Sequence, residues 1–111
     1  MIDREKFEDV VRKAAVQACD TAQEKGFWDE QTDTRTQQYA VKMALIHSEV
    51  SEALAELRKG NVTETVEELA DTVIRIFDLV WHMAPVSNFG KVILDKMETN
   101  KTRPRMHGKK F

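Results

Sequence analysis

Apolar residues recur three and four positions apart along most of the chain, with polar residues between them, and this spacing is typical of amphipathic helices. Together with helix stop signals, the pattern predicts four helices, at about residues 3–25, 35–59, 62–84 and 88–100. The expected ends of the first three helices are marked by Gly26, Gly60 and Pro85. A basic tail, 101–111, follows the fourth helix.

Two of the predicted helices begin with capping signals. Asn61, with Glu64 three residues later, resembles a capping box for the third helix, and Ser87 or Asn88 is expected to cap the fourth. Because the connections are short, neighbouring helices are expected to run antiparallel. The sequence therefore predicts an all-α fold, an antiparallel four-helix bundle, formed by residues 1–111 as a single domain.

Composition and charge narrow the functional classes. The chain has 111 residues, 41% of them hydrophobic and 32% charged, and its 4 glycines and 2 prolines are too few for the turns of an all-β fold. A net charge of −2 gives no basis for bulk attraction to nucleic acid or to a membrane, and no apolar run approaches the roughly 20 residues that span a bilayer. Cys19 is the only cysteine, so we expect a cytoplasmic protein with a buried or half-buried thiol.

Two pairs of carboxylates carry the strongest functional signal, Glu49 with Glu52 and Glu68 with Asp71. Each pair has i, i+3 spacing, so both side chains point to the same side of a helix. On adjacent antiparallel helices, four such acids can converge on one place. A cluster of this kind repels itself unless a cation binds there, and oxygen ligands suit a hard divalent ion such as Mg²⁺. The spacing therefore favours metal-assisted phosphate chemistry.

The position of the acids relative to the apolar faces differs between the two helices. One arc of helix 35–59 contains Val41, Leu45, Glu49, Glu52 and Glu56. The acids thus continue an apolar stripe, a place that an unpaired surface carboxylate would avoid. In helix 62–84 the acids occupy the polar side of an ordinary amphipathic helix. The structural alternative is therefore a solvated acidic surface, in which Arg75 pairs with Asp71 four residues earlier.

Two stretches of the chain, Ala44–Leu54 and Glu67–Leu79, together with the tail Asn100–Phe111, resemble the MazG-like all-α nucleoside triphosphate pyrophosphohydrolases. The similarity is greatest to the short single-domain members found in bacteriophages and bacteria. The signature of that family is E-E-x-x-E followed, after a spacer, by E-x-x-D. One departure is Ser48, which stands where the first glutamate of the signature would be.

The resemblance implies an enzyme that cleaves the bond between the α and β phosphates of an NTP or dNTP, releasing a nucleoside monophosphate and pyrophosphate. It also implies that Mg²⁺, or Mn²⁺ in its place, is bound by the four acids that match the signature, Glu49, Glu52, Glu68 and Asp71. Either Glu49 or Glu52 would be the catalytic base. The alternative is a non-catalytic helical interaction module of the same fold, which the departure at Ser48 keeps open.

Nucleotide-binding residues are also implied by the resemblance. Lys96 and Asn100 share a face of helix 88–100, and with Arg103 they are expected to contact the phosphates. Trp28 is expected to face the nucleobase. The structural alternatives are that the Lys96 stem covers apolar surface and that Trp28 anchors the core, where we also place Phe27.

The apolar faces of helices 35–59 and 62–84 exceed what one small bundle can bury. Members of the family that the chain resembles form dimers or tetramers. We therefore expect a homodimer or homotetramer, in which oligomerisation completes the bundle, with a nucleoside triphosphate as substrate.

Overall fold

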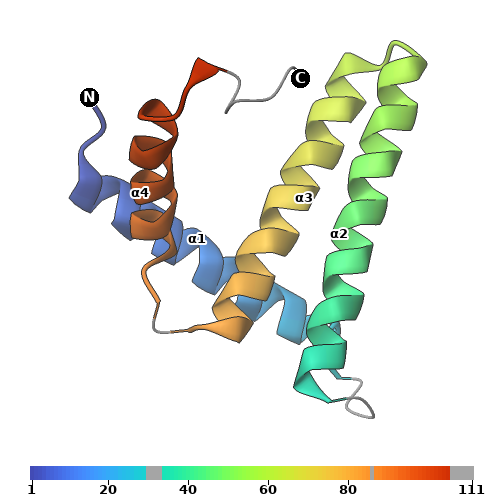
Figure 1. The fold of residues 1–111 in the computed structure, drawn as a ribbon. Coiled ribbons are helices and arrows are strands. Elements are labelled where there is room, and N and C mark those ends of the chain that lie inside the picture. The colour runs from blue at the N-terminus through green and yellow to red at the C-terminus, as the bar shows by residue number, and fades with distance from the viewer. Residues whose placement is uncertain (30–33, 86, 106–111) are drawn as a thin grey trace. The chain divides into compact units, whose positions relative to one another are not determined.

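The computed structural model describes residues 1–29, 34–85 and 87–105. Within these ranges the chain forms four helices and no strand (Figure 1). The helices are α1 (Arg4–Glu24), α2 (Arg35–Arg58), α3 (Val62–Met83) and α4 (Phe89–Lys101). Each boundary lies within one residue of the predicted one, so the all-α class is confirmed. Among the described residues, no helix combines the length and apolar character needed to cross a membrane.

The chain divides into two compact units. One consists of Met1–Lys13 with Ser87–Phe111, and the other is Ala14–Val86. The first part of α1 belongs to one unit and its second part to the other. The single domain over residues 1–111 and the antiparallel four-helix bundle stay predictions.

In the unit Ala14–Val86, α2 and α3 pack side by side as an antiparallel hairpin (Figure 1). The chain reverses at Gly60, whose φ of +82° lies in the left-handed region that glycine adopts without a Cβ penalty. The Gly60 N–H donates to the carbonyl of Leu57 (3.0 Å), and the Asn61 N–H donates to the carbonyl of Glu56 (3.0 Å). These two bonds form a Schellman motif, which ends α2 and starts α3 from one turn.

The caps of this hairpin differ in part from those predicted. Asn61 occupies the N-cap position of α3, but its side chain donates to Glu56 Oε2 (2.8 Å) and caps no backbone N–H, so the prediction of a capping box with Glu64 is wrong. The capping box is instead at the start of α2. There Thr34 Oγ1 accepts from the Gln37 N–H (3.2 Å), while Gln37 Oε1 accepts from the Thr34 N–H (2.9 Å).

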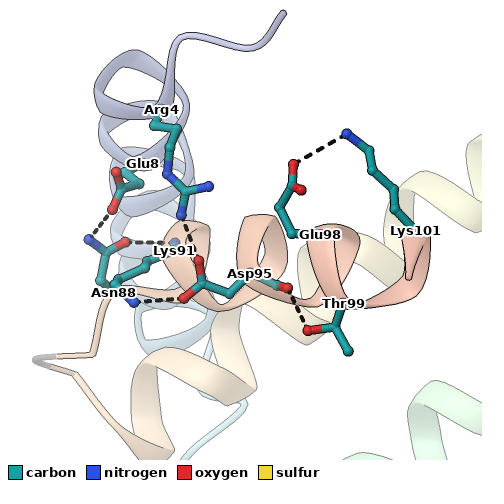
Figure 2. Close-up of polar contacts among 8 residues, drawn as sticks. All are labelled: Arg4, Glu8, Asn88, Lys91, Asp95, Glu98, Thr99 and Lys101. Carbon is teal, nitrogen blue, oxygen red and sulfur yellow. Dashed lines mark hydrogen bonds and ion pairs between the residues drawn. The ribbon is translucent and has the colours of Figure 1, made fainter. Parts of the chain in front are cut away.

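The other unit joins the start of α1 to α4 through polar contacts (Figure 2). Asn88 caps α4, one of the two predicted caps, and its amide also donates to Glu8 (2.6 Å). Arg4 forms an ion pair with Asp95 (2.7 Å). Gly90 is required by a close approach, because a Cβ at this position would lie 2.8 Å from the Cα of Glu8. These contacts fix α4 against the first turns of α1.

The core of the unit Ala14–Val86 is small. Ala22, Trp28 and Leu79 form a buried cluster, against which Tyr39 and Ile46 are partly buried. Apolar side chains remain exposed on both helices of the hairpin. Those with at least 43% of their surface exposed on α2 and α3 are Val41, Met43, Leu45, Val50, Leu54, Leu57, Val62, Val66, Leu69, Val73, Ile74 and Met83.

Phe27 is not a core residue as predicted. It is 51% exposed, and the Arg75 guanidinium carbon lies 5.6 Å from the centre of its ring. The Phe27 ring therefore packs against a guanidinium through a cation–π contact at the protein surface, and not against apolar side chains in the core.

Removing the Thr34 hydroxyl should destabilise the start of α2, because the Gln37 N–H loses its acceptor. We expect Thr34→Ala to lower the free energy of unfolding by about 0.5–2 kcal/mol. Thr63→Ala, at an exposed position of α3, should change it by less than about 0.5 kcal/mol. Denaturant unfolding followed by circular dichroism measures both values, and equal values for the two variants would contradict the assigned cap.

Candidate functional site

Three of the four predicted metal ligands converge between α2 and α3. Glu49, Glu68 and Asp71 each place a carboxylate oxygen within 4.8 Å of the others. The hairpin explains this arrangement, because Glu49 and Asp71 lie at equal sequence distances before and after Gly60. Because α2 ends and α3 begins at this turn, residues at equal distances from it lie at the same level along the two antiparallel helices.

Glu52, the fourth predicted ligand, is exposed and lies outside that group of three, but its charge acts on it. The pKa of Glu68 is raised above its ordinary value, first by loss of hydration and then by the negative charges of Glu52, Glu49, Asp71 and, most weakly, Glu56. All four predicted ligands therefore contribute to one region of negative potential, with Glu68 within it.

Arg75 supplies a counter-charge to this acidic cluster, defined as Glu49, Glu52, Glu68 and Asp71. Its Nε donates to Glu49 Oε1 at 2.7 Å, in an ion pair between side chains that are 37% and 15% exposed. The structural alternative in which Arg75 pairs with Asp71 on its own helix is wrong. The i, i+4 spacing allows that pair, but the Arg75 side chain reaches across the hairpin to α2 instead.

The donor set of the acidic cluster fits a hard divalent cation. Within the described residues, Arg75 forms the only ion pair found for these four carboxylates. Negative charge therefore remains in excess. Every ligand atom that these four side chains offer is an oxygen, the atom that Mg²⁺ and Mn²⁺ prefer. Several carboxylates close together are what would hold such an ion while leaving coordination positions for water and phosphate.

Glu56 continues the stripe on α2 but is engaged elsewhere. It accepts from Asn61 (2.8 Å) and pairs with Lys59 (3.4 Å) at the end of the helix. The pKa of Glu56 is lowered, mainly by the hydrogen bond from Asn61 and, more weakly, by Lys59. These contacts occupy the Glu56 carboxylate, which is therefore a weaker candidate ligand than the four carboxylates of the acidic cluster.

The predicted phosphate-contacting residues belong to the unit of Met1–Lys13 and Ser87–Phe111. Lys96 and Asn100 are exposed on α4, and Arg103 follows this helix, with its N–H donating to the carbonyl of Asn100 (3.3 Å). Neighbouring charges on α4 are paired, for example Lys101 with Glu98 (3.2 Å), as Figure 2 shows. A joint action of Lys96, Asn100 and Arg103 with the acidic cluster stays a prediction.

Trp28, the predicted nucleobase contact, is buried and has protein partners. It is 7% exposed, and its indole N–H donates to both carboxylate oxygens of Asp78 (2.9 and 3.2 Å). The ring stacks on His82 with centroids 3.7 Å apart and an angle of 15° between the planes. This packing matches the structural alternative of a core anchor, and the nucleobase role stays a prediction.

Arg75 is a site residue that the sequence analysis considered only in the structural alternative, as a partner of Asp71. The sequence did indicate that Arg75 lies beside the acids, because it follows Asp71 by four residues and Glu68 by seven and so shares their side of α3. A basic residue on the acidic side of a helix can pair within the helix or across to another. Only the packing of α2 against α3 distinguishes the two.

No family model, curated protein or solved structure matches the chain. The MazG-like resemblance therefore rests on the residues of the two motifs and the tail.

The raised pKa of Glu68 predicts that its ionised form destabilises the metal-free protein. In the unfolded chain this group ionises near its ordinary value of 4.5. Stability is therefore expected to fall as the pH rises through that value and then through the higher native pKa. We expect Glu68→Gln to raise the melting temperature in EDTA at neutral pH, with a smaller difference from wild type in acid.

Glu67→Gln is the matched control, because Glu67 is exposed and is not among the charges that raise the pKa of Glu68. Thermal unfolding of the three proteins in EDTA measures the effect. If Glu68→Gln melts no higher than Glu67→Gln, the carboxylates do not repel one another as inferred.

Proposed function

We propose that this chain is a Mg²⁺-dependent nucleoside triphosphate pyrophosphohydrolase that cleaves the α–β phosphoanhydride of an NTP or dNTP. The observation that supports the proposal is the convergence of Glu49, Glu68 and Asp71, with the charge of Glu52 acting on the same place. These are the four residues that match the signature of the MazG-like family.

In this proposal Glu49, Glu52, Glu68 and Asp71 hold Mg²⁺, for which Mn²⁺ can substitute. When bound there, such an ion would neutralise the phosphate oxygens and lower the pKa of the attacking water. Glu52 is the better placed of the two candidate bases, because Glu49 Oε1 already accepts from Arg75. A Glu52 carboxylate oxygen would accept a proton from the attacking water. The water oxygen would then bond to the α-phosphorus as the bond from that phosphorus to the leaving pyrophosphate breaks.

Arg75 has a second role in this proposal. A cation held by the acidic cluster would share the Glu49 carboxylate with Arg75, whose guanidinium also lies over the Phe27 ring. A guanidinium matches the geometry of phosphate oxygens, so Arg75 is suited to bind the triphosphate beside the acidic cluster. On the family resemblance alone, Lys96, Asn100 and Arg103 are proposed as further phosphate-binding residues.

The non-catalytic module is the second candidate, because Ser48 replaces the first acid of the signature. The two candidates differ in one observable, the metal-dependent release of pyrophosphate. If the folded protein binds nucleotides but releases no pyrophosphate, the non-catalytic module is supported and the enzyme is not.

Glu52→Gln and Asp71→Asn should each remove turnover without unfolding the protein. For Glu52→Gln we expect kcat to fall by about 10²–10⁴-fold, the usual contribution of a general base. The assay measures pyrophosphate and monophosphate from a panel of NTPs and dNTPs with Mg²⁺, Mn²⁺ or EDTA, and Glu67→Gln is the control. Near-native activity of either site variant with Mg²⁺ would show that the site is wrongly assigned.

We also propose that the chain assembles as a homodimer through the outer face of the hairpin. On α3 the exposed residues Val62, Val66, Leu69 and Val73 follow one another at helical spacing and form an apolar stripe. On α2, Val50, Leu54 and Leu57 form a second stripe. Continuous apolar surface of this kind is typical of an interface, and a second copy of the same hairpin presents a matching one.

A charge placed in the stripe should prevent this assembly. We expect Leu69→Lys to convert a wild-type dimer to monomer at micromolar concentration, whereas Val92→Lys, at an exposed apolar position of α4, should leave the dimer intact. Sedimentation velocity measures both. A monomeric wild type, or a dimer that tolerates Leu69→Lys, would exclude this interface.

A further inference from the structure

A second cluster of potential ligands lies in the unit Ala14–Val86 and shares no residue with the acidic cluster. Cys19 of α1 and Asp78 and His82 of α3 place a sulfur, a carboxylate oxygen and a ring nitrogen within 4.8 Å of one another. Asp78 and His82 share a side of α3 through their i, i+4 spacing. Cys19 belongs to the buried side of α1, and its burial at 5% exposure confirms the predicted buried thiol.

The distances between the ligand atoms are those of a compact coordination site. Cys19 Sγ lies 3.8 Å from His82 Nδ1, which lies 3.1 Å from Asp78 Oδ1. In a tetrahedral zinc site the bond lengths place sulfur and nitrogen ligands about 3.6 Å apart, and nitrogen and oxygen ligands about 3.3 Å apart. Both observed distances agree with these values to within a few tenths of an ångström.

We propose that Cys19 Sγ, His82 Nδ1 and Asp78 Oδ1 bind one thiophilic divalent metal ion, such as Zn²⁺, with water in the fourth position. A thiolate and a carboxylate together would balance the double charge of the ion, which suits ligands that are almost fully shielded from solvent. Thiolate and imidazole favour zinc, cobalt or copper over Mg²⁺. This centre and the acidic cluster are therefore selective for different classes of cation.

Two neighbouring side chains are arranged as outer partners of such a site. Trp28 donates to both Asp78 Oδ2 (2.9 Å) and Oδ1 (3.2 Å), which orients the carboxylate with Oδ1 3.1 Å from His82 Nδ1. The Gln23 amide lies 3.4 Å from His82 Nε2. The amide atom that faces the ring is the nitrogen, which donates to Nε2, so the ring proton is on Nδ1, 3.0 Å from the Asp78 carbonyl oxygen. A metal ion at Nδ1 would displace that proton, and the bond from Gln23 helps to orient the ring.

The same three residues do not form a nucleophilic triad. In such a triad the nucleophile contacts one ring nitrogen of the histidine and the carboxylate contacts the other. Here Cys19 and Asp78 both face His82 Nδ1. The Asp78 carbonyl oxygen also lies 3.0 Å from Nδ1, so three potential ligand atoms surround one ring nitrogen.

Titration of the EDTA-treated, desalted full-length protein with Co²⁺ tests the proposal, because thiolate coordination gives a charge-transfer band in the near ultraviolet. We expect one equivalent to bind, the band to disappear in Cys19→Ser, and the affinity to fall at least about tenfold in His82→Gln. His47→Gln is the matched control, since His47 is exposed and outside the cluster. One equivalent of Zn²⁺ should displace the cobalt, and excess Mg²⁺ should not.

A second measurement separates this centre from the acidic cluster and from effects on folding. Zn²⁺ should raise the melting temperature of the wild type and of Asp71→Asn, but not that of His82→Gln, with helical content checked by circular dichroism. Absence of the thiolate band in the wild type, or equal cobalt affinity in His82→Gln, would overturn the proposal. Neither result depends on nucleotide hydrolysis, so this proposal and the proposed enzyme can fail independently.

Discussion

The reversal of the chain at Gly60 is the constraint on which the candidate site depends. Gly60, in the left-handed conformation, ends α2 through the two Schellman hydrogen bonds, and α3 begins at the same turn and runs in the opposite direction. Nothing lies within 4 Å of a Cβ built on Gly60, so glycine is required there by its φ and not by crowding. Because α2 ends and α3 begins at this turn, the turn determines which acids of α2 lie opposite which acids of α3.

The consequence of that register is a concentration of negative charge that the protein only partly offsets. Arg75 binds Glu49, while Glu68 keeps a raised pKa among the remaining carboxylates. Repulsion among these carboxylates would be reduced by a bound cation. The softer donor set, Cys19, Asp78 and His82, uses α3 as well. Asp78 lies seven residues after Asp71, about 10 Å further along the helix axis.

The hairpin also explains the division between the two proposed surfaces of the unit Ala14–Val86. One side of α3 carries Glu68, Asp71 and Arg75, whose contacts face α2. A neighbouring side carries the exposed stripe from Val62 to Val73. With a core of only a few buried residues, the hairpin leaves apolar area that one copy of the chain does not cover. Covering it would stabilise the helices that hold the acids, which links assembly to the site.

Local sequence was enough to predict the four helices, the helix ends at Gly26 and Gly60, Asn88 as one of two candidate caps, and a buried or half-buried thiol. These features depend on residues three or four apart, on glycine conformation and on hydrophobicity. The convergence of Glu49, Glu68 and Asp71 was expected from spacing, but only the antiparallel packing of α2 on α3 brought their oxygens together.

Tertiary structure alone decided which partners the polar side chains take. Asn61 binds Glu56 instead of capping α3, Arg75 crosses to Glu49, and Trp28 is buried against Asp78 and His82. Each of these choices depends on how one helix is rotated and translated against another. Periodicity within a helix carries no information about that rotation, so the sequence by itself determined the elements and their faces, and packing determined what those faces contact.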